Sequence, residues 1–285
     1  MADPVAATPG TSAAKAGGES LVGLIARGVL DAELAALVWV LVEARIPLVI
    51  AAPVGREGAG AQLLAAIIGS IQPDEPLDPL ITPMGAAGAA SLVRGRRAGG
   101  VLAAASLADV RQRLGGGPLP LTDDQLTFLG CVLVLGESGE GRSAGRLRVT
   151  VAHYVRPLAR DAHGHSQRLD PAVLASWDDR LGKYEHFAWG VIPEIAARLA
   201  RRTGDLEADL HHRRDDLAGL AKAGVTSLDE VRPLVAGYRV GWGSGHDAGH
   251  DSGHGTEHGA GNGTEHGTEH AAEHDAGSES GHKAH

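Results

Sequence analysis

An apolar run that passes through glycines directly into a helix constrains the fold of this chain more than any other feature. Residues 47–54 read PLVIAAPV, and Gly55, Gly58 and Gly60 follow before the helix-like run AQLLAAIIGSI. A second apolar run, GGVLAAAS at 99–106, is again followed by a helix pattern, SLADVRQRLG, that Ser106 can cap. Buried strands that alternate with helices predict an α/β fold with a mostly parallel sheet flanked by helices.

Further helices and one hairpin are predicted around this pattern. ESLVGLIARG and DAELAALVWVLVEAR precede the first strand, and Asp31 is the expected cap of the second helix. CVLVLGE and RLRVTVAHYVRP flank the turn-rich SGEGRSAG and predict an antiparallel pair near 131–157. Residues 72–85 are rich in proline and are expected to be irregular, and residues 161–189 to be loop and short strand. Helix patterns return from Ile192 to Arg239.

Composition divides the chain into a folded part and two flanking segments. From Gly241 onward the sequence is almost entirely Gly, His, Glu, Asp, Ser, Thr and Ala, which bury too little apolar surface to offset their ordering entropy. The first 18 residues are small, polar and proline-bearing. We therefore expect disorder at 1–18 and 241–285, a core at 19–160, and a loop and helical part of the same domain at 161–240.

Charge and apolar patterning exclude several classes of partner. The segment from His246 carries eight acidic residues and one lysine, so it contributes −7 of the formal charge of −9. The nearly neutral remainder lacks the basic surface that nucleic acid requires. The longest apolar run, at 34–42, is too short to span a bilayer, and no signal pattern opens the chain. The single cysteine, Cys131, rules out an intrachain disulfide. We expect a cytoplasmic protein without a membrane span or a nucleic-acid partner.

The glycine-rich segment resembles a phosphate-binding loop whose chemical residues are absent. Gly55 and Gly60 fit the template G-x-x-x-x-G-K-[ST], but Ala61 and Gln62 occupy the lysine and hydroxyl positions. The lysine would contact the β- and γ-phosphates and the hydroxyl would hold Mg²⁺. Arg56 is the cation within the loop that would have to replace the lysine. The residues of this degenerate nucleotide site are Gly55, Arg56, Gly58, Gly60, Ala61 and Gln62.

The surrounding sequence resembles the motor domain of the type II/type IV secretion-system and pilus ATPases. In that family a helix and a strand ending in AGP lead into a loop of the G-x-x-G-x-G-K-T-T-L-L type, and Leu63 and Leu64 stand at its paired leucines. VLAAASLADVRQRL resembles the family's histidine box, with Ala103 at the position of the histidine. The resemblance covers about residues 20–155. It implies a P-loop-NTPase-like fold.

The departures from that family predict a protein without its chemistry. Only about 40 residues separate Gly60 from Gly100, and no apolar strand among them ends in the acid that supports Mg²⁺. Phosphoryl transfer depends on positioning and charge neutralisation, so ATP is not expected as a cofactor. We expect a pseudo-ATPase that acts as a scaffold or regulatory partner of an active paralogue or of its own copies. The alternative from the same residues is an unorthodox nucleotide-binding protein.

A histidine-rich tail suggests a third function, metal storage or delivery. Imidazoles that have carboxylates beside them suit divalent ions such as Ni²⁺ or Zn²⁺. The remaining histidines are scattered; His163 and His165 have a ligand spacing but are interpreted as part of a polar loop. Nine of the fifteen histidines lie in the tail, and these are the candidate metal ligands: His246, His250, His254, His258, His266, His270, His274, His282 and His285.

Overall fold

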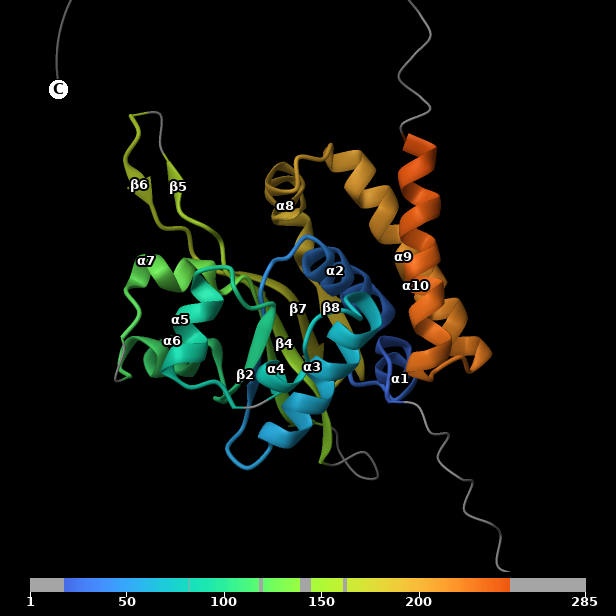
Figure 1. The fold of residues 1–285 in the computed structure, drawn as a ribbon, viewed down its shortest axis with the longest axis horizontal. Helices are drawn as coiled ribbons and strands as arrows, with labels where there is room; N and C mark the ends of the chain where they lie inside the picture. Colours follow the sequence, from blue (N-terminus) through green and yellow to red (C-terminus); the bar gives the residue numbers. More distant parts are fainter. Residues whose placement is uncertain (1–17, 82, 118–119, 139–144, 161–162, 247–285) are drawn as a thin grey trace, which may run out of the picture. The chain divides into compact units, whose positions relative to one another are not determined.

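A six-stranded open sheet lies at the centre of the fold (Figure 1). The computed structural model describes residues 18–81, 83–117, 120–138, 145–160 and 163–246. The spatial order of the strands is β2-β1-β3-β4-β7-β8, and β5 and β6 form a separate two-stranded ribbon. The strands are β1 (Leu48–Ala52), β2 (Gly99–Ala103), β3 (Cys131–Ser138), β4 (Arg146–Tyr154), β5 (Ala159–Arg160), β6 (Ser166–Gln167), β7 (Ala172–Asp178) and β8 (Lys183–His186).

Helices cover both faces of the sheet. In Figure 1, α1, α2, α3, α9 and α10 lie on one side of the sheet and α5, α6 and α7 on the other. The helices are α1 (Leu21–Ala26), α2 (Ala32–Glu43), α3 (Glu57–Ile71), α4 (Asp78–Ile81), α5 (Ala86–Val93), α6 (Leu107–Gly115), α7 (Asp123–Leu126), α8 (Ile192–Arg198), α9 (Thr203–Ala223) and α10 (Leu228–His246), with 3-10 turns η1 (Thr127–Leu129) and η3 (Ala188–Gly190). The compact unit extends through Gly243.

The central strand shows why the sheet needs helices on both sides. All five residues of β1 are buried. Leu48 and Ile50 belong to the apolar cluster beneath α2 and α3, whereas Val49 and Ala51 belong to the cluster beneath α5 and α6. Successive side chains of a strand point to opposite faces, so an uninterrupted apolar strand is stable only when both faces are covered.

The sheet is mixed, so the prediction of a mostly parallel sheet is wrong. β1 pairs in parallel with β2 and with β3, but β3–β4, β4–β7 and β7–β8 are all antiparallel. A parallel connection needs a crossover of a dozen or more residues, whereas only residues 139–145 connect β3 to β4. The predicted hairpin near 131–157 is confirmed, and β7 and β8 continue it as further antiparallel strands.

Several local predictions need correction. α3 begins at Glu57, not at residue 61, because the turn before it is short. The proline-rich segment contains α4, and α5 at Ala86–Val93 was not predicted, since its alanines and glycine carry little periodic signal. Within the segment expected to be loop and short strand, β7 is a strand of seven residues. The caps Asp31 and Ser106 are confirmed: each side chain accepts a hydrogen bond from the amide three residues ahead.

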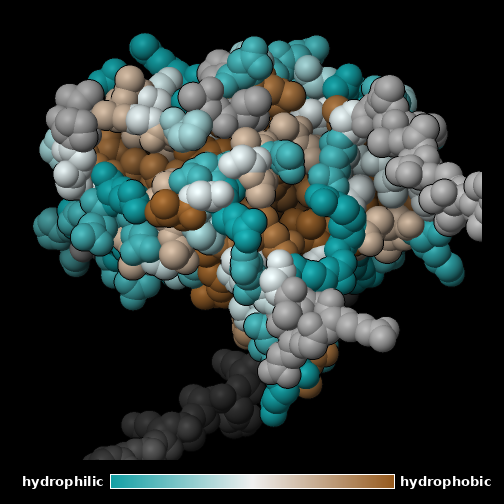
Figure 2. All heavy atoms as spheres, turned by 90° about the horizontal axis from the view of Figure 1, so that it is seen from below, coloured by the Kyte–Doolittle hydropathy of each residue, from teal (hydrophilic) through white to brown (hydrophobic). Residues whose placement is uncertain are grey.

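The second helix is apolar around most of its circumference because it is enclosed. Its residues from Leu34 to Val42 are all buried, and it packs against α3 and α9. A helix of this kind belongs in a protein core. No helix in the described part of the chain is both long and apolar enough to cross a bilayer. Figure 2 shows hydrophobic residues at recessed positions between hydrophilic elements on the face seen from below.

A buried ionic network joins α9 to the helices beside it; its members are Glu43, Arg201, Asp209, Arg213 and Tyr238. Asp209 is fully buried and accepts hydrogen bonds from Arg213 Nε at 2.8 Å, Arg201 Nη1 at 2.7 Å and the Tyr238 hydroxyl at 2.7 Å. Arg213 Nη1 forms an ion pair with Glu43 Oε2 at 2.6 Å. The network connects α2, α9 and α10.

Candidate functional site

The glycine-rich segment after β1 folds as a closed β-turn. The Arg56 amide donates a hydrogen bond to the Pro53 carbonyl at 2.8 Å. Gly55, at the third position of this turn, has a φ of 83°, a conformation that favours glycine. A phosphate-binding loop directs several successive amides toward a ligand. Here the turn uses the Arg56 amide internally, and the first turn of α3 follows at once.

Gly60 serves helix packing. It lies inside α3, and its amide donates to the Arg56 carbonyl at 3.1 Å. A Cβ atom built on Gly60 would lie 3.0 Å from Val101 Cγ1 and 3.1 Å from Ala52 Cβ, which are atoms of the sheet beneath. Glycine therefore allows α3 to approach β1 and β2 closely. Gly58, by contrast, has open space where a Cβ would be and a φ outside the left-handed region.

These two helical glycines give a matched pair of substitutions. We expect Gly60→Ala to lower the free energy of unfolding by about 1–2 kcal/mol, because the added methyl group meets atoms of the sheet that cannot yield freely. Gly58→Ala should raise it by about 0.5–1 kcal/mol through the higher helix propensity of alanine. Urea denaturation of both variants measures the difference. Equal effects of the two substitutions would contradict the packing role of Gly60.

The positions of the missing P-loop lysine and hydroxyl are also helical. Ala61 and Gln62 belong to the second turn of α3, and Ala61 packs partly buried against the core. Neither residue lies in the turn that precedes the helix. The six predicted site residues thus lie close together along the chain, but they form a turn and the start of a helix, and not a loop that encloses a phosphate.

An ion pair lies where open α/β sheets usually bind ligands. That position is at the carboxyl ends of neighbouring parallel strands whose connections leave in opposite directions. In this sheet β1 is flanked by β2 and β3, so the position is between β1 and β3. Arg56 from the turn after β1 pairs there with Glu137 from the extended end of β3. Glu137 and the first-turn acid Glu57 both disfavour a phosphate at this end of α3.

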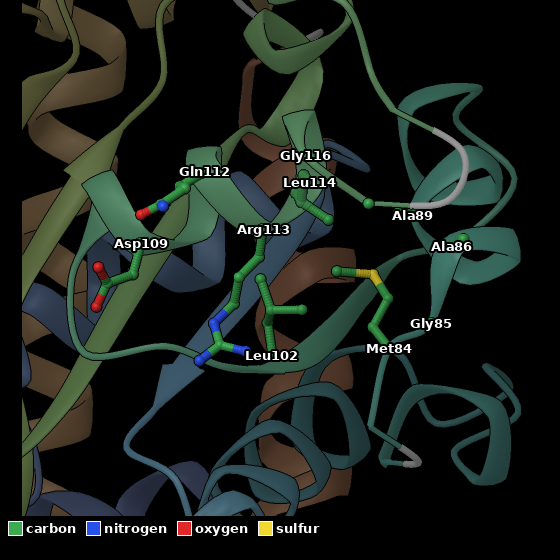
Figure 3. A pocket seen from close by; sticks show the side chains of 11 residues that line it. Met84, Gly85, Ala86, Ala89, Leu102, Asp109, Gln112, Arg113, Leu114 and Gly116 are labelled. Atoms are coloured by element: carbon green, nitrogen blue, oxygen red, sulfur yellow. The ribbon is translucent and has the colours of Figure 1, made fainter.

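A pocket lies between α6, β2 and the start of α5. Its volume is about 610 Å³, and Arg113 and Met84 point into it (Figure 3). Asp109, at the start of α6, instead accepts a hydrogen bond from the Ala105 amide at 3.1 Å. Ala103, at the position of the family's box histidine, ends β2 without a polar side chain. The pocket offers one exposed cation and no nucleophile.

The histidines of the described residues do not form a metal centre. No group of three or more His, Cys, Asp or Glu side chains in the described ranges could hold a metal ion. The His163 and His165 rings lie 6.3 Å apart, centre to centre, on an exposed loop. Of the predicted tail ligands, His246 ends α10, and the eight from His250 to His285 lie outside the described residues.

One of the scattered histidines of the body, His186 in β8, contacts carboxylates. His186 Nε2 lies 2.8 Å from Asp31 Oδ2, and Nδ1 lies 3.8 Å from Glu33 Oε1. Burial opposes the charged form, but the Asp31 hydrogen bond and the two carboxylates outweigh it and raise the pKa of His186. Asp31 also caps α2, so this contact ties β8 to the start of that helix. Nothing in the sequence spacing, which is 155 residues, indicates the contact.

The thiol of Cys131 is not available as a nucleophile. Cys131 is buried at the start of β3, and burial raises its pKa to about 12. A thiol with that pKa is almost entirely protonated at neutral pH. Cys131 is thus a small residue of the apolar core.

Neither a scan against protein-family models nor a search of curated proteins finds a match to this chain.

Proposed function

We propose that this chain is a non-catalytic scaffold or regulatory protein built on an α/β fold that resembles a P-loop motor ATPase. The observation that carries the proposal is the closure of the turn between β1 and α3. The Arg56 amide is bonded to Pro53, its guanidinium is paired with Glu137, and Gly60 is packed within the helix. These contacts support a structural role for residues that would hold a phosphate in an active relative.

The first test is nucleotide turnover. We expect the purified full chain to release no phosphate from ATP in the presence of Mg²⁺ and to show no saturable binding of ATP by calorimetry. The physical reason is that no lysine or hydroxyl is placed at the turn to neutralise the phosphates or hold the metal. Saturable ATP binding without turnover would favour the alternative, an unorthodox nucleotide-binding protein.

A restored loop serves as the control for this test. Ala61→Lys with Gln62→Thr supplies the missing residue types, but both positions lie inside α3 and no metal-supporting acid accompanies them. The double variant should therefore remain inactive in the same phosphate-release assay. Robust hydrolysis by the double variant would contradict our interpretation of the segment between residues 61 and 99.

An exposed aromatic pair supports an interaction role. Phe187 is 47% exposed and Trp189 is 62% exposed, and both lie in the connection between β8 and α8. Large apolar side chains gathered on a surface are typical of protein contacts. If the scaffold acts by binding its own copies, the full chain should self-associate. This association should weaken when Phe187 and Trp189 are both replaced by serine. Phe128→Ser, at a 48% exposed phenylalanine in η1, is the matched control in sedimentation velocity.

A further inference from the structure

One arginine of the sheet is buried without a polar partner. Arg148, in β4, is 5% exposed, and its Nε atom has no hydrogen-bond partner. It makes no hydrogen bond or ion pair with another residue in the described ranges. Its guanidinium carbon lies 3.6 Å from the centre of the Trp177 ring. The ring face attracts the cation but accepts none of its in-plane N–H groups.

Arg148 lines a pocket that an outside molecule can enter. The pocket has a volume of about 680 Å³ and lies between the α1–α2 connection, β4 and the β7–β8 hairpin. Two other cations line it, Arg146 and Lys183. Arg146 Nη2 donates to the Arg27 carbonyl at 2.8 Å, and Lys183 is exposed. Within the described ranges, the protein therefore satisfies the cations of the pocket only in part.

The two carboxylates of the pocket are already engaged elsewhere. Asp31 Oδ1 accepts a hydrogen bond from the Leu34 amide at 2.9 Å, and Asp31 Oδ2 lies 2.8 Å from His186 Nε2. Asp179 accepts the indole N–H of Trp177 at 2.8 Å, which holds the ring that Arg148 stacks on. Both acids shape the pocket without pairing with Arg148.

The charge and the walls of the pocket define the class of ligand. Three cations and two carboxylates line it, so a group with a single negative charge balances the site better than a phosphate dianion. A carboxylate accepts two parallel N–H bonds from a guanidinium. The side chains of Ile25 and Leu30 supply apolar wall beside these charges.

We propose that this pocket binds a small carboxylic acid, with its carboxylate on Arg148 and its apolar part against Ile25 and Leu30. This binding site is separate from the β1–α3 turn and goes beyond the scaffold role. A ligand bound there would contact the α1–α2 connection, β4 and the β7–β8 hairpin at the same time. Its binding should therefore raise the melting temperature of the protein.

The test uses sodium benzoate as the probe and the full chain as the protein. We expect saturable binding of benzoate by calorimetry, a rise in melting temperature, and no binding of benzamide, which has the same ring without the charge. Arg148→Met should weaken benzoate binding at least about tenfold, because a charge-assisted hydrogen-bond pair is lost. Arg180→Met removes an equal charge from the exposed turn of the same hairpin and should change the affinity less than about twofold.

A second variant and two inorganic anions test the proposal further. Lys183→Met changes an exposed side chain, so it should fold normally even if Arg148→Met does not, and it should weaken benzoate binding about threefold. Inorganic phosphate and sulfate, titrated in parallel, test the ligand class. Absence of saturable benzoate binding, unchanged binding by Arg148→Met or Lys183→Met, or tighter binding of phosphate than of benzoate would each overturn the assignment.

Discussion

Replacing Asp209 by alanine is expected to lower the free energy of unfolding by about 3–5 kcal/mol, because the buried guanidinium of Arg213 loses the carboxylate bonded to its Nε and keeps Glu43 as its ion-pair partner. Asp209 is fully buried and bonds both Arg213 and Arg201. Burial opposes its ionisation, but the hydrogen bonds from Arg213, Tyr238 and Arg201 outweigh burial and lower the pKa of Asp209. Urea denaturation at pH 7 measures the loss.

Two companion variants separate this network from ordinary ion pairing. Asp215→Ala removes an exposed acid from the same helix, where it pairs with Arg214, and should leave the urea midpoint nearly unchanged. Asp209→Leu with Arg213→Met removes both buried charges and should cost less than Asp209→Ala alone. If the double variant is at least as unstable as Asp209→Ala, the two buried groups do more than neutralise each other's charge, and their interaction itself stabilises the fold.

The lowered pKa of Asp209 also predicts how the stability of the fold depends on pH. Because the pKa of Asp209 is lower in the folded state, its contribution to stability is complete above the unfolded pKa of about 3.9. That contribution is lost as the pH falls through the folded value. Acid denaturation of Asp209→Asn should therefore show a weaker dependence on pH below about 4 than that of the natural chain.

The second large effect concerns metal binding by the tail. At pH 7.5 we expect the full chain to bind several Ni²⁺ or Zn²⁺ ions, and at pH 5 to bind few. Imidazoles with an ordinary pKa near 6.5 are mostly neutral at the higher pH and mostly protonated at the lower one, and a protonated imidazole cannot be a ligand. Calorimetric titration at the two pH values measures the change.

A chain that ends at His246 is the control for the metal titration. This end preserves α10 as a whole and removes eight of the nine tail histidines. The truncated chain should bind little metal, and its melting temperature should not respond to metal, because the described residues hold no group of three ligands. If truncation leaves most of the binding intact, the site lies in the body, and His163 and His165 become the residues to replace.

The order of the elements along the chain follows from local sequence patterns. The uninterrupted apolar runs of β1 and β2 require cover on both faces, and both strands lie where the sequence predicts them. Caps at Asp31 and Ser106 depend on the backbone within three residues, so single side chains are sufficient to predict them. The hairpin of β3 and β4 is predictable for the same reason, because a short turn-rich connection leaves the second strand only an antiparallel direction.

Local patterns could not decide the direction and number of the remaining strands. β7 has weak alternation, with half-buried residues at both ends, and its place in the sheet depends on pairing with β4. Pairing between segments distant in sequence is set by which edges remain open after the rest of the sheet forms, and no window of residues contains that information. The mixed character of the sheet is thus a tertiary property.

Residue types alone establish that the glycine-rich segment lacks a lysine and a hydroxyl, and that the tail is dense in imidazoles. The roles of the glycines depend on the folded chain: Gly55 forms a turn, and Gly60 allows a close contact with Val101, which is 41 positions further along the chain. The structure likewise placed Arg148 over Trp177 and left its Nε without a partner. Residue type sets which interactions a side chain can make, whereas burial and contact depend on segments that meet only when the whole chain packs.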